Sequence, residues 1–265
     1  GTHVATTIAA NNTGSTGFVG VAPKARILSY AIFDDFGWVG GEEIAIDSAR
    51  KKGARVINMS YVAAVPGKVF SSDLLSVMAS AKNKNLVFVK AAGNDAVKLT
   101  SWVMPFNAFS RLKNLIIVGN IKRNKKIHWS SNRPGGACFR NPGKPCKTKN
   151  KFMYFFVVAP GTNIYAGKGS GGYISYTGTS MAAPHVTGVV ALLQGYWPVL
   201  KKRAGSVTNI IFHTAQDLGA KGVDAIYGWG LVRADRAMSP LGRKLLKKNN
   251  KVYALSSSRL RVSHA

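Results

Sequence analysis

The sequence of 265 residues has few acidic residues, little cysteine and no long apolar run. Its two cysteines are too few for a disulfide framework, and no nearby residues complete a zinc site. Its longest apolar stretches, residues 152–159 and 186–193, fall well short of the roughly 20 residues that a membrane-spanning helix needs. We therefore expect no transmembrane segment. Residue 1 is a Gly inside a polar motif, so we also expect the sequence to begin within a longer protein.

The scarcity of acidic residues leaves a large positive charge. There are 10 Asp plus Glu against 37 Lys plus Arg, for a formal net charge of +27. Such a field favours anionic partners, so anionic surfaces are candidate partners. The basic residues gather in short runs, which most often form solvated surface. No stacking aromatics, zinc-finger spacing or recognition helix accompanies them, so we predict no specific nucleic-acid binding. The runs are residues 122–126, 140–151, 201–203 and 243–251.

Apolar segments of two kinds alternate along the chain and predict its fold class. Hydrophobic residues make up 46% of the sequence, which is enough for a sizeable core. Helical spacing of apolar residues predicts helices over 41–52 and 71–83. Alternating strands and helices indicate an α/β fold, with a mostly parallel sheet and helices on both faces. The predicted strands, rich in Val, Ile and Phe, are residues 26–32, 54–60, 86–91, 115–119 and 155–159.

A glycine-rich segment at 167–172 has the spacing G-x-G-x-x-G of a dinucleotide-binding turn. That turn works only between a strand and a helix. Here an alternating Tyr-Ile-Ser-Tyr segment follows instead, so we interpret residues 168–177 as a β-hairpin.

The strongest chemical signal is Gly-Thr-Ser-Met-Ala-Ala-Pro-His-Val-Thr-Gly at 178–188, which leads into an apolar helical segment. It places Ser180 at a helix start, where backbone N–H groups stabilise a developing oxyanion. Pro184 is expected in the first helical turn, where a missing N–H costs nothing. A lone Ser at a helix start is more often an N-cap than a nucleophile, so the neighbouring motifs decide the interpretation.

Taken together, these motifs resemble those of the subtilisin-like serine proteases, and the resemblance spans residues 1 to about 238. Residues 178–188 match the nucleophile motif of that family, and Gly-Thr-His-Val at 1–4 matches the end of its histidine motif. The other matching segments follow in the family's order: 20–23, the substrate-binding strand 56–60, the oxyanion loop 91–94, 159–161 and the closing segment 227–232.

The resemblance implies a role for each site residue of a serine endopeptidase that needs no cofactor and acts on polypeptides. Ser180 is the nucleophile, and Asn94 donates its side-chain amide to the oxyanion. Residues 36–39 are expected to add an edge strand to the bound peptide. Asn94 as a turn former and Tyr61 as a core aromatic are the structural alternatives. The two walls of the primary specificity pocket are Ser60, Tyr61 and Val62, and Ala91, Ala92 and Gly93.

The same resemblance places two members of the catalytic triad outside the sequence. The family's base immediately precedes Gly-Thr-His-Val, and its Asp lies further upstream, so the chain as given is expected to be inactive. His3 and His185 are then structural. The alternative is a catalytically dead relative that binds peptides or anionic surfaces.

Two departures from the family pattern qualify the expected site. Val62 replaces a family Gly and should narrow the pocket mouth, which favours small P1 residues. Thr6 replaces another Gly and must be accommodated by helix packing. The loop 11–17, where many relatives bind calcium, has no carboxylate, so no metal is expected.

Cys138 and Cys146 flank a seven-residue loop that resembles the loop disulfide of exported bacterial subtilases of the autotransporter type. Two surface thiols are the alternative. An oxidised pair suits an extracytoplasmic protein, so we expect a secreted or cell-surface location. The expected domains are a peptidase domain at 1–239, which lacks its N-terminal part, and a basic extension or linker at 240–265.

Overall fold

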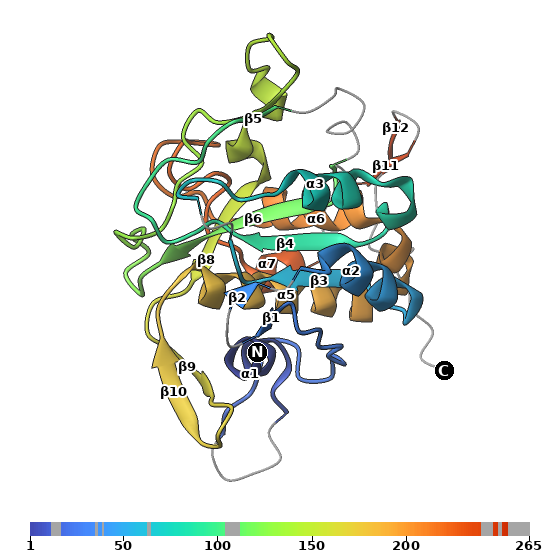
Figure 1. Ribbon diagram of the computed structural model, residues 1–265, viewed down its shortest axis with the longest axis vertical. Coiled ribbons are helices and arrows are strands. Elements are labelled where there is room, and N and C mark those ends of the chain that lie inside the picture. Colours follow the sequence, from blue (N-terminus) through green and yellow to red (C-terminus); the bar gives the residue numbers. More distant parts are fainter. Residues whose placement is uncertain are drawn as a thin grey trace.

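The fold is built on a four-stranded parallel sheet (Figure 1). The computed structural model describes residues 1–11, 17–34, 37–38, 40–62, 65–103, 112–239, 246–248 and 251–253. The strand order is β3-β4-β6-β8. These strands confirm four of the five predicted strands, and β4 and β6 are wholly buried because both faces are covered. Their bounds are β3 Val56–Met59, β4 Val87–Ala91, β6 Leu115–Ile121 and β8 Phe156–Pro160.

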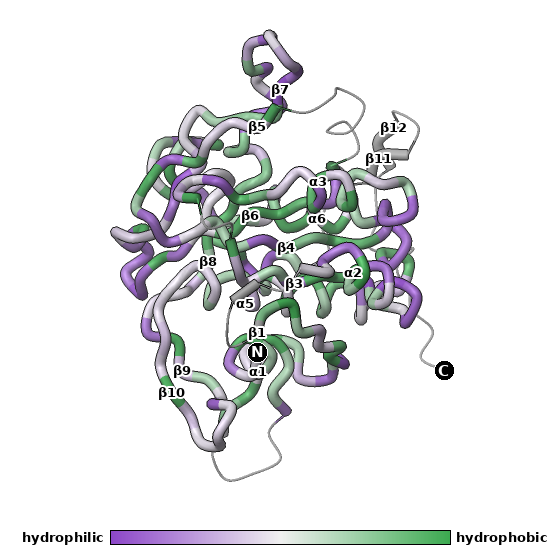
Figure 2. Tube along the Cα trace, viewed as in Figure 1, coloured by the Kyte–Doolittle hydropathy of each residue, from purple (hydrophilic) through white to green (hydrophobic). Residues whose placement is uncertain are grey.

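Helices cover both faces of the sheet and form two cores. Helices α2 (Glu42–Lys51) and α3 (Ser72–Ala79) pack on one face, where Phe88 of β4 belongs to their core. Helices α5 (Thr179–Tyr196) and α6 (Ala204–Thr214) pack on the other, against Val87 and Val89. Alternate residues of one strand thus serve opposite cores. Figure 2 shows the apolar residues concentrated along these strands and helices. The predicted α/β fold is confirmed.

Smaller elements complete the described chain. The predicted helix 71–83 ends early, because Ser80 is extended and separates α3 from a 3₁₀ turn. None of the described helices has the length and apolar character needed to cross a membrane. The remaining elements are α1 Thr2–Ala9, β1 Phe33–Asp34, β2 Gly37–Trp38, η1 Ala81–Asn83, β5 Trp102–Val103, β7 Phe139–Arg140, η2 Thr148–Asn150, η3 Phe152–Phe155, β9 Ile164–Gly167, β10 Tyr173–Tyr176, η4 Pro198–Lys202, α7 Ala234–Ala237, β11 Leu246–Lys248 and β12 Lys251–Tyr253.

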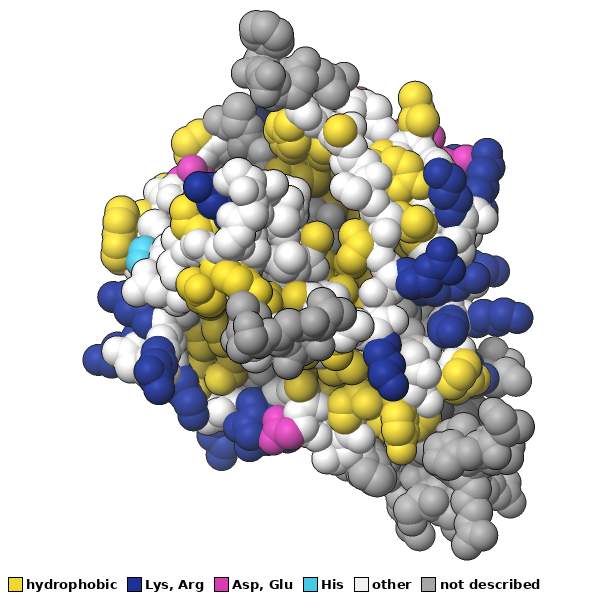
Figure 3. All heavy atoms as spheres, turned by 90° about the horizontal axis from the view of Figure 1, so that it is seen from below, with side chains coloured by type: hydrophobic (Ala, Val, Ile, Leu, Met, Phe, Trp, Pro, Cys, Tyr) yellow, Lys and Arg dark blue, Asp and Glu magenta, His cyan; other side chains and the backbone are white. Residues whose placement is uncertain are grey.

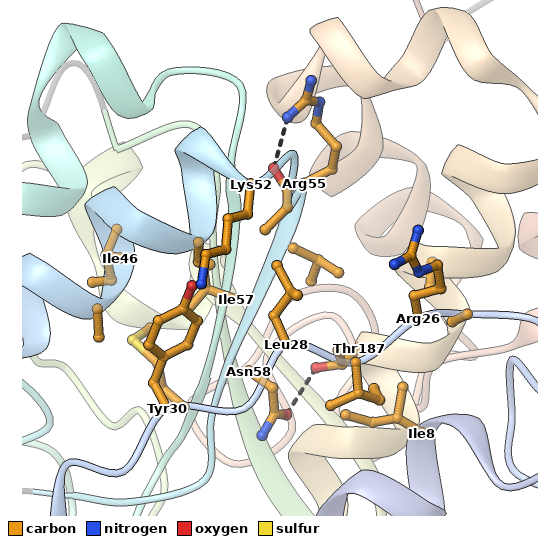
Figure 4. A pocket seen from close by; sticks show the side chains of 18 of the residues that line it. Ile8, Arg26, Leu28, Tyr30, Ile46, Lys52, Arg55, Ile57, Asn58 and Thr187 are labelled. Atoms are coloured by element: carbon orange, nitrogen blue, oxygen red, sulfur yellow. Dashed lines mark hydrogen bonds between the residues drawn. The ribbon is translucent and has the colours of Figure 1, made fainter.

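The predicted strand 26–32 is wrong, because this segment lies outside every described sheet. A strand needs a partner, and the near edge of β3 pairs with no other described strand. A cavity of about 560 Å³ lies between residues 26–32 and β3. Leu28, Ile57 and Asn58 project into it, and Lys52 and Arg55 lie at its rim (Figure 4). The side chain of Leu28 is accordingly 42% exposed, despite its apolar character.

The glycine-rich segment forms the turn of a hairpin, as predicted. Strands β9 and β10 pair antiparallel, with Gly167 opposite Tyr173. Gly171 and Gly172 have φ angles of +90° and +72°, the left-handed region that glycine adopts readily. The hairpin lies beside α1 (Figure 1), and no helix follows the turn directly, so a dinucleotide-binding turn is excluded.

The cysteine pair forms a disulfide, with 5.8 Å between the Cα atoms of Cys138 and Cys146. It closes the basic loop that projects at the top of Figure 1. Lys and Arg side chains also border the face seen from below in Figure 3, where Asp and Glu are sparse. Most of the predicted extension 240–265 lies outside the described residues, as do residues 12–16 of the loop 11–17, at which no metal is expected.

Candidate active site

Ser180 lies where the carboxyl ends of two neighbouring strands meet the start of α5. It is the second residue of the helix, and its side chain is half-buried. Ser60 follows β3 and Asn94 follows β4, so the parallel sheet brings both loops to this edge. The first N–H groups of a helix have no partner within it, and the N–H of Ser180 forms no hydrogen bond with the described residues.

The side chain of Asn94 is anchored to the start of α5, which carries Ser180. Its Oδ1 accepts the Thr179 N–H at 2.8 Å and the Thr179 hydroxyl at 3.2 Å. Oδ1 is occupied by these donors, whereas Nδ2 forms no hydrogen bond with the described residues and is the part of the amide available to a ligand. The sequence-predicted pair, Asn94 and Ser180, is therefore brought together at one helix terminus.

Asn132 holds the loop that carries Asn94, and the sequence analysis did not identify it as a site residue. Its buried Oδ1 accepts the N–H groups of Asp95 at 3.0 Å and Val97 at 3.2 Å. Its Nδ2 donates to the Ala92 carbonyl at 3.0 Å and the Asp95 carboxylate at 2.9 Å. The residues that bond to the Asn132 side chain lie 35 to 40 positions from it in the sequence, so no local sequence pattern reveals these bonds.

Gly93 is required where the loop meets Asn132. Its φ of +104° is unfavourable for residues with a side chain, and an added Cβ would lie 2.3 Å from Asn132 Nδ2. Its N–H donates to the Thr179 hydroxyl at 3.1 Å, so the loop and the helix start are joined here as well.

Pro184 is the sixth residue of α5 rather than a first-turn residue, which corrects the expectation for this position. A proline there has no N–H to donate to the carbonyl four residues earlier, which is that of Ser180. The Ser60 hydroxyl donates to this carbonyl instead, at 2.8 Å. Asn58 donates to Ser60 at 2.9 Å and accepts from Thr187 at 2.9 Å (Figure 4). These linked side-chain hydrogen bonds connect β3 to α5.

The two predicted pocket walls follow adjacent strands. Ala91, Ala92 and Gly93 are buried, whereas Ser60, Tyr61 and Val62 are half-buried. The large cavity beside β3 borders Tyr61 but none of the other five, so this cavity is distinct from the predicted specificity pocket. The predicted edge strand falls partly outside the described residues, since only Gly37–Trp38 of it is described.

The two histidines near the site, His3 and His185, each form a hydrogen bond with a backbone carbonyl. His3 Nε2 lies 2.9 Å from the Ile164 carbonyl, and His185 Nδ1 lies 2.9 Å from the Met181 carbonyl. Burial lowers the pKa of His185, despite the opposing effect of its bond to Met181. Among the described residues, no side chain hydrogen-bonds the Ser180 hydroxyl. Thr6, also on α1, uses its hydroxyl to accept the Gly167 N–H at 3.0 Å, which accommodates it against β9.

Sequence comparison places the chain among known proteases. The sequence model of the Subtilase family matches residues 1–230. Subtilisin DY of Bacillus licheniformis is 34% identical over 241 residues, which cover 89% of this chain and 76% of that protein. Fervidolysin of Fervidobacterium pennivorans is 33% identical over 253 residues, and an extracellular protease of Xanthomonas campestris pv. campestris is 30% identical over 257. The chain spans only 34% and 40% of the lengths of these last two.

Solved structures share the fold. The prenylagaramide maturation protease PagA matches with a TM-score of 0.67 at 23% identity, over 89% of this chain and 80% of that one. The patellamide maturation protease PatA matches with a TM-score of 0.66 at 22% identity, over the same shares. At such identities the likeness concerns the fold alone. With the family match over most of its length, the chain belongs to the subtilase family of subtilisin-like serine proteases.

Proposed function

We propose that this domain is the core of a serine endopeptidase that hydrolyses polypeptides through an acyl-enzyme on Ser180. The observation that carries the proposal is the bond between Asn94 Oδ1 and the Thr179 N–H. It orients an amide donor and the N–H of Ser180 toward the same helix terminus. Two donors beside a serine hydroxyl are the requirements for stabilising the oxyanion of acyl transfer.

In the proposed reaction, Ser180 Oγ attacks the peptide carbonyl while its proton passes to a base. The carbonyl oxygen becomes an oxyanion, held by Asn94 Nδ2 and the Ser180 N–H. Collapse of this intermediate breaks the C–N bond, and the base returns the proton to the leaving amine. Water then attacks the ester in the same way and releases Ser180. No cofactor takes part in these steps.

We propose that the base is a His directly before Gly1 and that its orienting Asp lies further upstream in a longer protein. Two features support this. His3 is committed to Ile164, and α1, which begins beside Gly1, packs against α5. The cavity between residues 26–32 and β3 would accept an added strand along the edge of β3 that no described strand pairs with.

Val62 in the pocket wall supports a class of substrate, and the disulfide supports a cellular location. Val62, at the end of the β3 wall, favours small P1 side chains. The disulfide suits an extracytoplasmic compartment, and one relative is described as an extracellular protease, so we propose secretion or display at the cell surface. We further propose that residues 1–239 form the peptidase domain and that 240–265 are a separate basic extension.

A catalytically dead relative that binds peptides or anionic surfaces is the competing function, favoured by the net charge of +27. It predicts intact peptide binding without covalent chemistry at Ser180. It also predicts a steep loss of anion binding with added salt, because released counterions dominate such affinity.

Covalent labelling of Ser180 tests the proposal. A fluorophosphonate reacts only with an activated nucleophile. The natural full-length protein should be labelled, its Ser180→Ala variant should not, and the 265-residue chain should label at a far lower rate. Labelling that survives Ser180→Ala would refute the assignment of the nucleophile. Equal labelling rates of the chain and the full-length protein would show that the base lies within these 265 residues.

A further inference from the structure

Lys90 is a fully buried lysine in the central strand β4, one residue before the pocket wall Ala91–Gly93. Its side chain is 1% exposed and lies among apolar neighbours on the α2 and α3 face. Lysine is almost never fully buried without a partner. None of the described carboxylates forms an ion pair with it.

The partner of Lys90 is the other pocket wall. Its ammonium donates to the Tyr61 main-chain carbonyl and lies 3.8 Å from the centre of the Tyr61 ring. Charge-assisted hydrogen bonds are stronger than neutral ones, and a desolvated cation over an aromatic face adds a further attraction. Both interactions weaken when the ammonium loses its charge.

Lys90 is one of the polar contacts that hold the Ser60–Val62 wall, and the Tyr61 side chain also interacts with Glu42 of α2. Ser60 is held to α5 through its bond to the Ser180 carbonyl. Tyr61 is held to β4 through Lys90, and its ring also packs against Phe33, with 5.6 Å between the ring centres. Among the described side chains, Lys90 is the one that bonds the main chain of Tyr61 to the sheet.

We infer that Lys90 is a positioning residue for substrate: its buried charge holds the Tyr61 main chain in the conformation that an extended peptide needs to bind along Ser60–Val62. The inference rests on the proposed function. Lys90 touches no substrate atom and acts only through Tyr61.

The charge on Lys90 changes within the range of physiological pH. Burial lowers its pKa to about 7, and the Glu42 carboxylate at the start of α2 opposes this fall. Tyr61 stays neutral throughout, because burial and then Glu42 raise its pKa. Glu42 and Tyr61 are the described titratable groups that act on Lys90. Peptide binding should therefore be tighter below pH 7 than above it.

Peptide affinity as a function of pH tests the inference on the 265-residue chain. The probe is tetramethylrhodamine-Ala-Ala-Pro-Ala amide, whose dissociation constant is measured by fluorescence anisotropy at pH 6 and pH 9 and constant ionic strength. We expect binding to be about tenfold weaker at pH 9, the effect of losing one charge-assisted hydrogen bond.

Four variants separate positioning from simple packing. Lys90→Met keeps the volume but not the charge, so it should bind weakly and equally at both pH values. Lys90→Arg should bind tightly at both, because its charge persists. Glu42→Gln should move the midpoint of the affinity profile to lower pH, because it removes the carboxylate that raises the pKa of Lys90. This variant replaces Lys90→Arg as the test if the arginine variant fails to fold. Lys84→Met, which removes an exposed lysine just before β4, should keep the original profile.

Two contrary outcomes are distinguishable. Equal probe affinity at pH 6 and pH 9 that Lys90→Met leaves unchanged would reduce Lys90 to a space-filling residue. Peptide binding itself would leave the proposed function standing, since covalent labelling of Ser180 tests it separately. Failure of folded protein to bind the probe at any pH would overturn both the positioning role and the proposed function.

Discussion

Lys90 should also make the stability of the domain depend on pH in a way that can be calculated. The perturbation is Lys90→Met, which removes a buried charge and retains a long apolar side chain. Burial lowers the lysine pKa from 10.5 to about 7 in the folded protein. Between these values the unfolded chain binds a proton that the folded chain has lost, so the free energy of unfolding rises with pH.

The size of the effect follows from the two pKa values. The slope is about 1.4 kcal/mol per pH unit, which accumulates to about 3–4 kcal/mol between pH 7 and pH 10. Below pH 7 both states carry the charge, so the cost of burying it is fully present there. The fold is therefore least stabilised by Lys90 under the conditions in which its charge holds Tyr61.

Urea denaturation followed by tryptophan fluorescence at pH 7, 8, 9 and 10 measures this effect. Other lysines also titrate at alkaline pH, so the quantity of interest is the difference in unfolding free energy between the native sequence and Lys90→Met. That difference should move in favour of the native sequence as pH rises. A difference that stays constant within 1 kcal/mol, or moves the opposite way, would refute the calculation and mean that the Lys90 charge is compensated in the folded state.

Three further predictions concern the site. Asn94→Ala in the full-length protein should lower kcat by about 10²–10³ with little change in KM, a magnitude known from subtilisin and carried over from it; a change in KM alone would limit Asn94 to shaping the pocket. Gly93→Ala should lower the free energy of unfolding by about 1–3 kcal/mol in urea melts, because of its φ of +104° and the contact with Asn132; an unchanged melt would show that the loop yields easily. Val62→Gly should broaden P1 preference toward large side chains on a peptide library, and an unaltered preference would remove Val62 from the pocket mouth.

Local motifs were sufficient to predict that Ser180 and Asn94 lie close together. Each belongs to a short contiguous segment, so both could be selected without knowledge of the fold, and their catalytic roles stay a prediction. The four confirmed strands were readable for a similar reason, since burial on both faces makes each a continuous apolar run.

Features that depend on distant partners were not predictable. Residues 26–32 have the composition of a strand, but a strand also requires a ladder partner that the described chain does not supply. Asn132 acts through bonds to residues 35 to 40 positions away. Lys90 stands in an otherwise apolar strand, and only the register of β3 against β4, which places Met59 beside it, brings Tyr61 within reach.

The bond between Asn94 and Thr179 has a mechanical consequence. Asn94, the proposed donor to the substrate oxyanion, is held at 2.8 Å by the N–H of Thr179, the residue before Ser180, and not only by the loop that follows β4. When α5 shifts against the sheet, as packed helices do during thermal motion, the amide is drawn along with the serine. The distance between the Asn94 amide and the Ser180 hydroxyl then depends mainly on the hydrogen bond to Thr179. Motions elsewhere in the domain change this distance little.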